Sequence, residues 1–181
     1  MITPTLETDR LILRPLTLSD ADAIYQNWAT DPDVAKYMRW SIHSSVDVTK
    51  EWLKAVEENI DDNEVYDWGF VLKQNGMLIG SGGLYWKEIH SCFEVGYNLM
   101  KKYWNQGLTT EAAAEMVRFA KEELKQKELF CCHAKENVAS GKVMEKVGFR
   151  YVKDGSYTSF DGERTFETRE CRLRCVSFER G

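Results

Sequence analysis

The stretch CFEVGYNLMKKYWNQGLTTEAAAEMVRFAKEELK, residues 92–125, changes its hydrophobic pattern once, and this change determines the fold. Its first nine residues alternate between two faces, which predicts a β-strand. One face of that strand carries Phe93, Val95, Tyr97 and Leu99. After Thr109 the period becomes helical, with one apolar stripe formed by Leu108, Ala112, Ala113, Met116, Phe119, Ala120 and Leu124. The stretch therefore predicts a strand, a tight turn and a helix.

The turn NQGLTT, residues 105–110, has the features of an anion site. A helix that begins at a turn directs unpaired backbone N–H groups, and the positive end of its dipole, at whatever lies before it. Gly107 lets a phosphate approach the main chain, while Thr109 and Thr110 are small and offer hydroxyls. We therefore expect a pyrophosphate at this turn.

A second part of the chain supports this reading. The strand-like run ELFCCHA, residues 128–134, is followed by ENVASGKVMEKVGFRYV, residues 136–152. The segment YWNQGLTTEA, followed by N-x-x-S and then EKVGF, resembles the Gcn5-related N-acetyltransferase (GNAT) family. The opening ETDRLILRPLTLSDAD is similar to the branch that contains the ribosomal-protein N-terminal alanine acetyltransferases. The resemblance covers nearly the whole chain. The family usually has glycine where Asn105 stands and alanine or glycine where Thr109 stands.

The resemblance implies one acetyltransferase domain over residues 1–181. Its fold would be α+β, a mixed α/β arrangement with a mostly antiparallel sheet of six to seven strands, a splayed parallel pair and flanking helices. Acetyl-coenzyme A would be the co-substrate, with its pantetheine arm between the splayed strands. The residues implied as cofactor contacts are Asn98, Leu99, Met100, Asn105, Gln106, Gly107, Leu108, Thr109, Thr110, Asn137, Ser140 and Lys142.

Two residues match catalytic positions of the family. Glu94 lies midway along the strand that enters the turn, where relatives carry a glutamate that removes a proton through water. The alternative for Glu94 is an ordinary strand carboxylate. Many family members assist the leaving thiol with a tyrosine close to this place, and the branch that this sequence resembles commonly has the serine of N-x-x-S instead, so the resemblance implies Ser140 for this role. No tyrosine occurs in GKVMEKV, residues 141–147, and the alternative for Ser140 is a helix N-cap. A main-chain N–H, freed where the strand bends near Asn98 and Leu99, would polarise the carbonyl.

The acceptor is expected at the irregular loop 39–44. In this fold such a loop lies over the acceptor pocket, so Trp40 and His43 are substrate-contact candidates; otherwise Trp40 fills the core and His43 is solvated. The segment between Met38 and Asp47 contains no Asp or Glu, which favours a peptide N-terminus over a polyamine. A small-amine acetyltransferase and a non-catalytic coenzyme A binding module remain alternatives.

Composition narrows the class of partner. With 181 residues and 43% hydrophobic content the chain can bury one core. A net charge of −5 argues against nucleic acid or an anionic membrane as the main partner. Neither a membrane span nor a signal peptide is indicated, so we expect a cytoplasmic protein, monomeric or homodimeric. The five cysteines are read as reduced thiols, and no metal is expected because Cys and His lack ligand spacing.

The remaining elements follow from periodicity and turn residues. Strands are predicted at Arg10 to Leu16, Tyr66 to Leu72, Met77 to Trp86 and Leu129 to Ala134, the last parallel to the strand of the decisive stretch, with a final hairpin over Tyr151 to Cys175. Helices are predicted at Ala21 to Ala29 behind a Ser19 and Asp22 capping box, at Pro32 to Met38, after Ser44 or Ser45 with Val48, Trp52, Val56 and Ile60 on one face, and at Ser140 to Val147 before Gly148.

Overall fold

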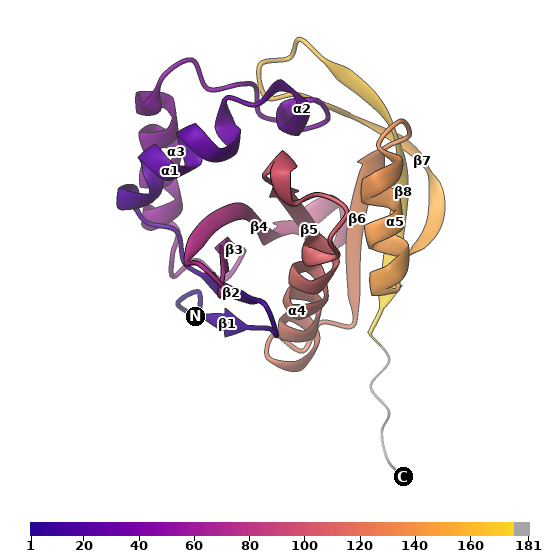
Figure 1. Cartoon of the computed structure of the whole chain (residues 1–181). Coiled ribbons are helices and arrows are strands. Elements are labelled where there is room, and N and C mark those ends of the chain that lie inside the picture. The colour runs from indigo at the N-terminus through magenta and orange to yellow at the C-terminus, as the bar shows by residue number, and fades with distance from the viewer. Residues whose placement is uncertain (176–181) are drawn as a thin grey trace.

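The computed structural model describes residues 1–175, which form one twisted sheet covered by helices (Figure 1). The strands are β1 (Leu6–Glu7), β2 (Leu11–Arg14), β3 (Val65–Leu72), β4 (Met77–Lys87), β5 (Cys92–Leu99), β6 (Glu128–Ala134), β7 (Arg150–Thr158) and β8 (Thr165–Arg174). The helices are α1 (Ala21–Ile24), continued by a π-helical turn over Tyr25–Ala29, then α2 (Pro32–Ala35), α3 (Val46–Glu58), α4 (Leu108–Glu122) and α5 (Val138–Val147). Short 3₁₀ turns occupy Leu18–Asp20, Glu88–His90 and Lys101–Tyr103.

The sheet has eight strands in the order β1-β2-β3-β4-β5-β6-β8-β7. The sequence predicted six to seven strands. The additional strand is β1 at the edge of the sheet, which is only two residues long and therefore too short to show an alternating hydrophobic pattern. All neighbours are antiparallel except β5 and β6. The mostly antiparallel sheet with one parallel pair is therefore confirmed.

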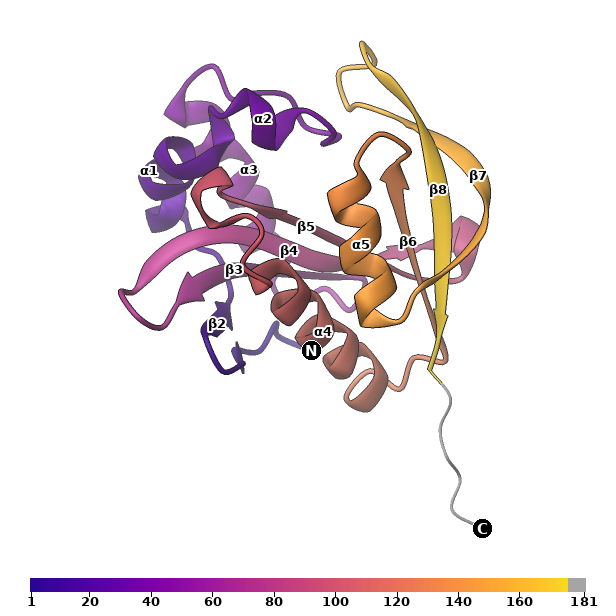
Figure 2. The same cartoon turned by 45° about the vertical axis from the view of Figure 1, so that its right-hand side comes forward.

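The parallel strands β5 and β6 separate almost at once. They pair only at Phe93 with Leu129 and at Glu94 with Phe130, and beyond these pairs they run apart (Figure 2). The register between β4 and β5 is continuous as far as the pair of Gly80 with Leu99. β5 therefore stays paired to β4 as far as Leu99 while β6 leaves it, and the bend of β5 near Asn98 and Leu99 stays a prediction.

The separation exposes one edge of β5. The Met100 N–H donates to the Ile79 carbonyl over 2.7 Å, and main-chain groups in an antiparallel pair alternate in direction. The peptide groups of Val95, Tyr97 and Leu99 therefore point away from β4, into the space that β6 has left. We call this space the wedge.

Two helical layers cover the sheet (Figures 1 and 2). The face bearing Phe93, Val95 and Leu99 packs on α4 and α5 in the larger hydrophobic cluster, so the predicted stripe of α4 is confirmed. The smaller cluster joins α1, the π-helical turn, α2 and α3 to the opposite face, where Trp28 and Leu53 are fully buried. The alternation of β5 therefore sends its apolar side chains to one layer and Glu94, Gly96 and Asn98 to the other.

Two local predictions in the N-terminal half are wrong. The first capping contact joins the Thr17 N–H to Asp20 over 2.9 Å, two residues before the predicted pair, because the chain makes a 3₁₀ turn ahead of α1. The inward face of α3 carries Thr49, Leu53 and Val56, whereas Val48 is 41% exposed. Thr49 is buried because its hydroxyl bonds to His43, an interaction that hydrophobic periodicity does not reveal.

Candidate active site

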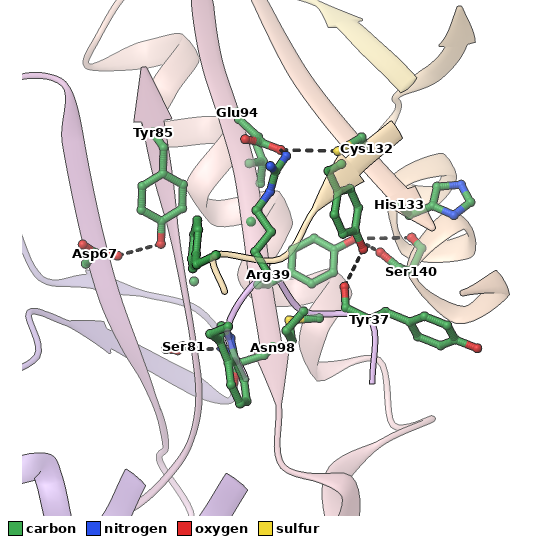
Figure 3. Close-up of a pocket in the computed structure, with 18 of the residues that line it drawn as sticks. Tyr37, Arg39, Asp67, Ser81, Tyr85, Glu94, Asn98, Cys132, His133 and Ser140 are labelled. Atoms are coloured by element: carbon green, nitrogen blue, oxygen red, sulfur yellow. Dashed lines mark hydrogen bonds and ion pairs between the residues drawn. The ribbon is translucent and has the colours of Figure 1, made fainter. Parts of the chain in front are cut away.

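A cavity of about 710 Å³ lies between the sheet and the α1 to α3 layer and reaches the wedge. Its floor is a face of β3, β4 and β5, and its roof contains Trp28, Trp40, His43 and Trp52. Its far wall, across the wedge, includes His133 on β6 and Asn137 and Ser140 at the start of α5 (Figure 3). One continuous space therefore connects the roof loop with the separated strands.

Strand register arranges the floor in three rows. Residues paired across β3, β4 and β5 are Val65, Tyr85 and Glu94 in the first row, Asp67, Gly83 and Gly96 in the second, and Gly69, Ser81 and Asn98 in the third. Cross-strand partners point to the same side of a sheet. Glu94 and Asn98 therefore lie at opposite ends of β5 on one floor, with Gly96 between them.

Glu94 sits among two cations and a thiol. Its side chain is 13% exposed and faces the Arg39 guanidinium at 3.8 Å and the Lys87 ammonium at 3.3 Å. It also accepts a hydrogen bond from the Cys132 thiol on β6 over 3.4 Å (Figure 3). Burial, followed by the charge of Glu94, raises the pKa of Cys132 to about 12. The carboxylate is therefore held at the edge of the wedge beside a neutral thiol.

Ser140 lies against a tyrosine that the sequence did not place there. The Tyr97 hydroxyl is 3.2 Å from the Ser140 hydroxyl and donates to the Ser140 carbonyl over 3.3 Å. Burial raises the pKa of Tyr97 above its ordinary value, so the phenol stays neutral. The sequence analysis looked for a tyrosine only among the residues that follow Ser140. Tyr97 was missed because it lies on β5 and contacts Ser140 across the wedge.

Ser140 is not the N-cap of α5, which was the alternative to its catalytic role. The helix begins at Val138, and the Asn137 side-chain oxygen accepts from the Ser140 N–H over 3.2 Å. Asn137 is therefore the N-cap. The Ser140 hydroxyl is consequently available to the cavity.

Asn98 presents an unusual polar atom to the cavity. Its amide nitrogen donates to the Ser81 hydroxyl over 2.9 Å. Its amide oxygen is buried and has no hydrogen-bond partner within residues 1–175. Leaving such an acceptor unpaired costs about 1–3 kcal/mol. The Asn98 side chain is therefore anchored to β4 through its nitrogen alone, and its oxygen has spare capacity to accept a hydrogen bond.

The roof loop is held from outside by the turn between β7 and β8. The Arg164 guanidinium donates to the carbonyls of Ala35, Met38 and Trp40 over 3.0–3.3 Å. Below it, Trp40 and His43 pack edge to face at 5.7 Å. Burial lowers the pKa of His43, whose ring bonds to Thr49. Trp40 and His43 both line the cavity, and Trp40 also packs against the smaller hydrophobic cluster, so their role as acceptor contacts stays a prediction.

The anion turn lies apart from this cavity. Gly107 is the N-cap of α4 with a φ of 76°, and Asn105 also has a positive φ of 60°. Arg10 donates to the Gln106 carbonyl over 2.9 Å and pairs with Glu111 at 2.7 Å, which ties β2 to this helix end. Among the predicted cofactor contacts, Asn98, Asn137 and Ser140 line the cavity, and Leu99, Met100, residues 105–110 and Lys142 do not.

Several cavity residues were not predicted from sequence: Arg39, Asp67, Tyr85, Lys87, Tyr97 and Cys132. Of these residues, only Tyr85 could have been placed from the sequence, because the register between the two predicted strands pairs it with Glu94. Within residues 1–175 no group of His, Cys, Asp and Glu is arranged to hold a metal ion. In the same residues, no helix has the length and apolarity that crossing a membrane requires.

Fold and cavity together define a mixed α/β domain with a substrate-sized cavity beside a separated pair of parallel strands. Residues 10–150 match the family model described as the acetyltransferase (GNAT) domain. The chain is 25% identical to uncharacterized N-acetyltransferase p20 of Bacillus licheniformis over 158 residues, 87% of each chain. The chain therefore belongs to the GNAT acetyltransferase family and is an N-acetyltransferase, for which acetyl-coenzyme A is the usual co-substrate.

Solved structures agree with this assignment. The ribosomal-protein-S5-alanine acetyltransferase of Vibrio fischeri matches with a TM-score of 0.82 and 17% identity, over 97% of this chain and 99% of that one. The microcin C7 self-immunity acetyltransferase MccE, solved with acetyl-coenzyme A and AMP, matches with a TM-score of 0.81 and 12% identity, over 92% and 93%. At these identities the likeness shows the fold, and the GNAT fold predicted from the sequence is confirmed.

Proposed function

We propose that the protein transfers acetyl from acetyl-coenzyme A to the α-amine of a protein N-terminus, by direct attack while both substrates are bound. The observation that carries this proposal is the single cavity that joins the wedge to the roof loop. A thioester entering from the wedge side and an amine entering beneath Trp40 would meet beside β5. No group of the protein then has to carry the acetyl.

The wedge and the α4 turn suit coenzyme A. Gly107 leaves the helix end uncovered, because the nearest atom to an added Cβ would be an Arg10 nitrogen at 3.5 Å. Backbone N–H groups there, with Arg10 beside them, form a site for the pyrophosphate. The Leu99 carbonyl already accepts a hydrogen bond from the Trp104 indole over 2.7 Å. The peptide groups of Val95 and Tyr97 and the Leu99 N–H remain along the wedge to bond the pantetheine amides and polarise the thioester carbonyl.

In the proposed step, the amine nitrogen attacks the acetyl carbonyl carbon. A C–N bond forms, the C–S bond breaks, and its electron pair leaves on sulfur. The proton released from nitrogen passes through water to Glu94 and then to solvent. Because the pKa of Tyr97 is raised while a thiol ordinarily has a pKa of about 8.5, Tyr97 donates a hydrogen bond to the thiolate and keeps its proton.

Cys132 does not offer a covalent route. A thiol attacks a thioester as the thiolate, and the pKa of about 12 leaves very little thiolate at neutral pH. The thiol also donates its hydrogen to Glu94. In the proposed mechanism the acetyl group therefore passes directly to the amine, without an acetyl-cysteine intermediate on Cys132.

Energetics and charge favour an N-terminal amine. An α-amine with a pKa of about 7.7–8.0 costs at most ~1.4 kcal/mol to deprotonate at pH 7, whereas lysine with a pKa of about 10.4 costs ~4.6 kcal/mol. Glu94 is paired with Arg39 and Lys87, so its carboxylate is not free to bind an additional ammonium group of a polyamine. The structural likeness to the Vibrio fischeri ribosomal-protein acetyltransferase supports the same acceptor class.

Asn98 fits the acceptor side of this scheme better than the cofactor side. Its side chain lies on the floor, facing the roof loop, while the pantetheine would follow the opposite edge of β5 in the wedge. The unpaired amide oxygen can accept a hydrogen bond from the attacking amine. We therefore assign the side chain of Asn98 to positioning of the acceptor.

The test is acetyl-coenzyme A consumption across N-terminal peptides and small amines, with mass spectrometry to locate the acetyl group. Peptides with a free, small first residue should react faster than spermidine at equal concentration. Trp40→Ala should raise the KM for the peptide more than the KM for acetyl-coenzyme A. Spermidine reacting faster, or both KM values staying unchanged, would overturn the peptide assignment.

A further inference from the structure

Asp67 and Tyr85 form a pair on the cavity floor that acetyl transfer itself does not use (Figure 3). The Tyr85 hydroxyl donates to the Asp67 carboxylate over 2.6 Å. This bond sits two residues along β4 from the level of Glu94, at the row that contains Gly83 and Gly96. The pair therefore occupies the middle of the floor.

The two glycines make this arrangement possible. A Cβ at Gly83 would lie 2.6 Å from the Tyr85 hydroxyl oxygen, and a Cβ at Gly96 would lie 3.3 Å from the Tyr85 ring. Real side chains do not tolerate the first contact. The position of the Tyr85 ring therefore requires a glycine at residue 83, whereas a side chain at residue 96 would only press the ring aside by a few tenths of an ångström. The Tyr85 ring thus lies over two paired glycines, and its hydroxyl fixes the orientation of the Asp67 carboxylate, which lines the cavity.

The charge of Asp67 is not matched by the protein. The cations that line the cavity, Arg39 and Lys87, both contact Glu94 instead. Asp67 forms no ion pair with another group of residues 1–175, and burial raises the pKa of its carboxyl despite the Tyr85 hydrogen bond. This part of the cavity is therefore complementary to a cation.

Strand spacing gives the distance from that carboxylate to the reaction. Asp67 is on β3, two strands from β5, and neighbouring strands lie about 4.8 Å apart. The acetyl group would be bound along β5, so a cation at Asp67 would be roughly 10 Å from the attacking nitrogen. Consecutive Cα atoms are about 3.8 Å apart, so a long basic side chain on the second or third residue of a peptide can span this distance.

We propose that Asp67, oriented by Tyr85, binds a basic side chain at the second or third position of the acceptor peptide. The proposal rests on the proposed acceptor class and adds a specificity to it. A guanidinium is the best match, because it is always charged and can donate to both oxygens of a carboxylate. The enzyme would select N-termini in which a small first residue is followed closely by Arg or Lys.

The test compares two peptides that differ only in charge at the second residue, one with arginine and one with citrulline. Neither side chain can be acetylated under these conditions, so the α-amine is the only acceptor. The wild-type enzyme should show a kcat/KM at least about tenfold higher for the arginine peptide. In Asp67→Asn this ratio should fall to near one, because the amide keeps the shape and the Tyr85 hydrogen bond but loses the charge.

Two further variants make the result specific. Tyr85→Phe keeps the ring over the glycines and removes the donor, so the ratio should fall only partly. Asp61→Asn removes an exposed carboxylate outside the cavity and should preserve the full ratio. Thermal melts of all four proteins confirm folding before rates are compared.

Failure of the inference and failure of the proposed function are distinguishable. Peptides acetylated at equal rates with arginine or citrulline, or a ratio that Asp67→Asn leaves unchanged, would overturn the Asp67 assignment while leaving N-terminal acetylation intact. No acetylation of either peptide would overturn the peptide acceptor itself. Spermidine outrunning the arginine peptide, and losing that advantage in Asp67→Asn, would show that the cation subsite serves a polyamine and would overturn the peptide proposal.

Discussion

At the scale of single residues, two roles of Glu94 can be distinguished by their pH dependence: anchoring the loop that carries Arg39, and accepting the proton of the acceptor amine. Its contacts with Arg39 and Lys87 hold the loop that carries Arg39 against β5. A carboxylate that only organised the loop would matter equally at every pH. A proton acceptor matters most where the acceptor amine is still protonated.

Replacing Glu94 with Gln should lower kcat/KM by roughly 10²-fold at pH 7. The deficit should shrink as pH rises towards 9, because the peptide amine then loses its proton without help. Initial rates from pH 6.5 to 9 measure this, with Glu51→Gln on the exposed side of α3 as the matched control. A deficit that is constant with pH would reduce Glu94 to a structural role.

The leaving group needs less help, and the structure offers two hydroxyls for it, those of Tyr97 and Ser140. Tyr97→Phe should lower kcat by about tenfold, because a neutral phenol contributes a hydrogen bond to the thiolate. Ser140→Ala should cost less. Single-turnover rates test both, and equal kcat in Tyr97→Phe and wild type would remove the tyrosine from the mechanism.

These residues also mark where sequence reasoning fails. The alternating pattern of residues 92–100 predicts the strand position of Glu94, and its catalytic role comes from the resemblance to the family and stays a prediction. Tyr97 was read only as part of the apolar face, since its contact with Ser140 spans 43 residues. No local sequence pattern marks Asp67 and Tyr85. Their arrangement depends on Gly83 and Gly96, which only the pairing of β3, β4 and β5 brings next to them.

At the scale of elements, the turn before α4 combines a positive helix end with a guanidinium. Arg10 contacts Gln106 and Glu111, so β2 fixes the turn from the N-terminal side. The sequence predicted the glycine and the helix because both are local. It did not predict Arg10, whose contact with the turn spans 96 residues.

Gly107 allows a test in which backbone shape is constant. Its φ of 76° is tolerated by both Asn and Asp, so the two variants differ mainly in charge. Gly107→Asp should weaken coenzyme A binding at least about tenfold more than Gly107→Asn, since the new carboxylate repels the pyrophosphate. Calorimetry with coenzyme A measures both affinities, and equal affinities would move the phosphate site elsewhere.

The turn between β7 and β8 should control the acceptor without touching coenzyme A. Arg164 supplies the hydrogen bonds that hold the loop over the cavity. Arg164→Met keeps the aliphatic stem and should raise the peptide KM severalfold, with the KM for acetyl-coenzyme A unchanged. Arg169→Met, on the exposed side of β8, is the control; a parallel rise in both KM values would contradict the clamp.

At the scale of the whole molecule, function follows from one topological event, the separation of β6 from β5. In the proposed mechanism, coenzyme A binds at the main-chain edge of β5 that this separation exposes, and the acceptor binds on the floor formed by β3 to β5. The sequence indicated the order strand, turn, helix, parallel strand, and from it the sheet. The eighth strand, the shape of the cavity and the loop clamp depend on contacts between distant segments, so periodicity could not supply them.

The central claim is direct transfer between two substrates held in one cavity. Its most direct test is the initial rate of acetylation of an N-terminal peptide, measured as both acetyl-coenzyme A and peptide concentrations vary. Double-reciprocal lines that intersect are predicted, because both substrates must be bound before either product leaves. Parallel lines, together with an acetyl group retained on the enzyme when peptide is omitted, would contradict the account.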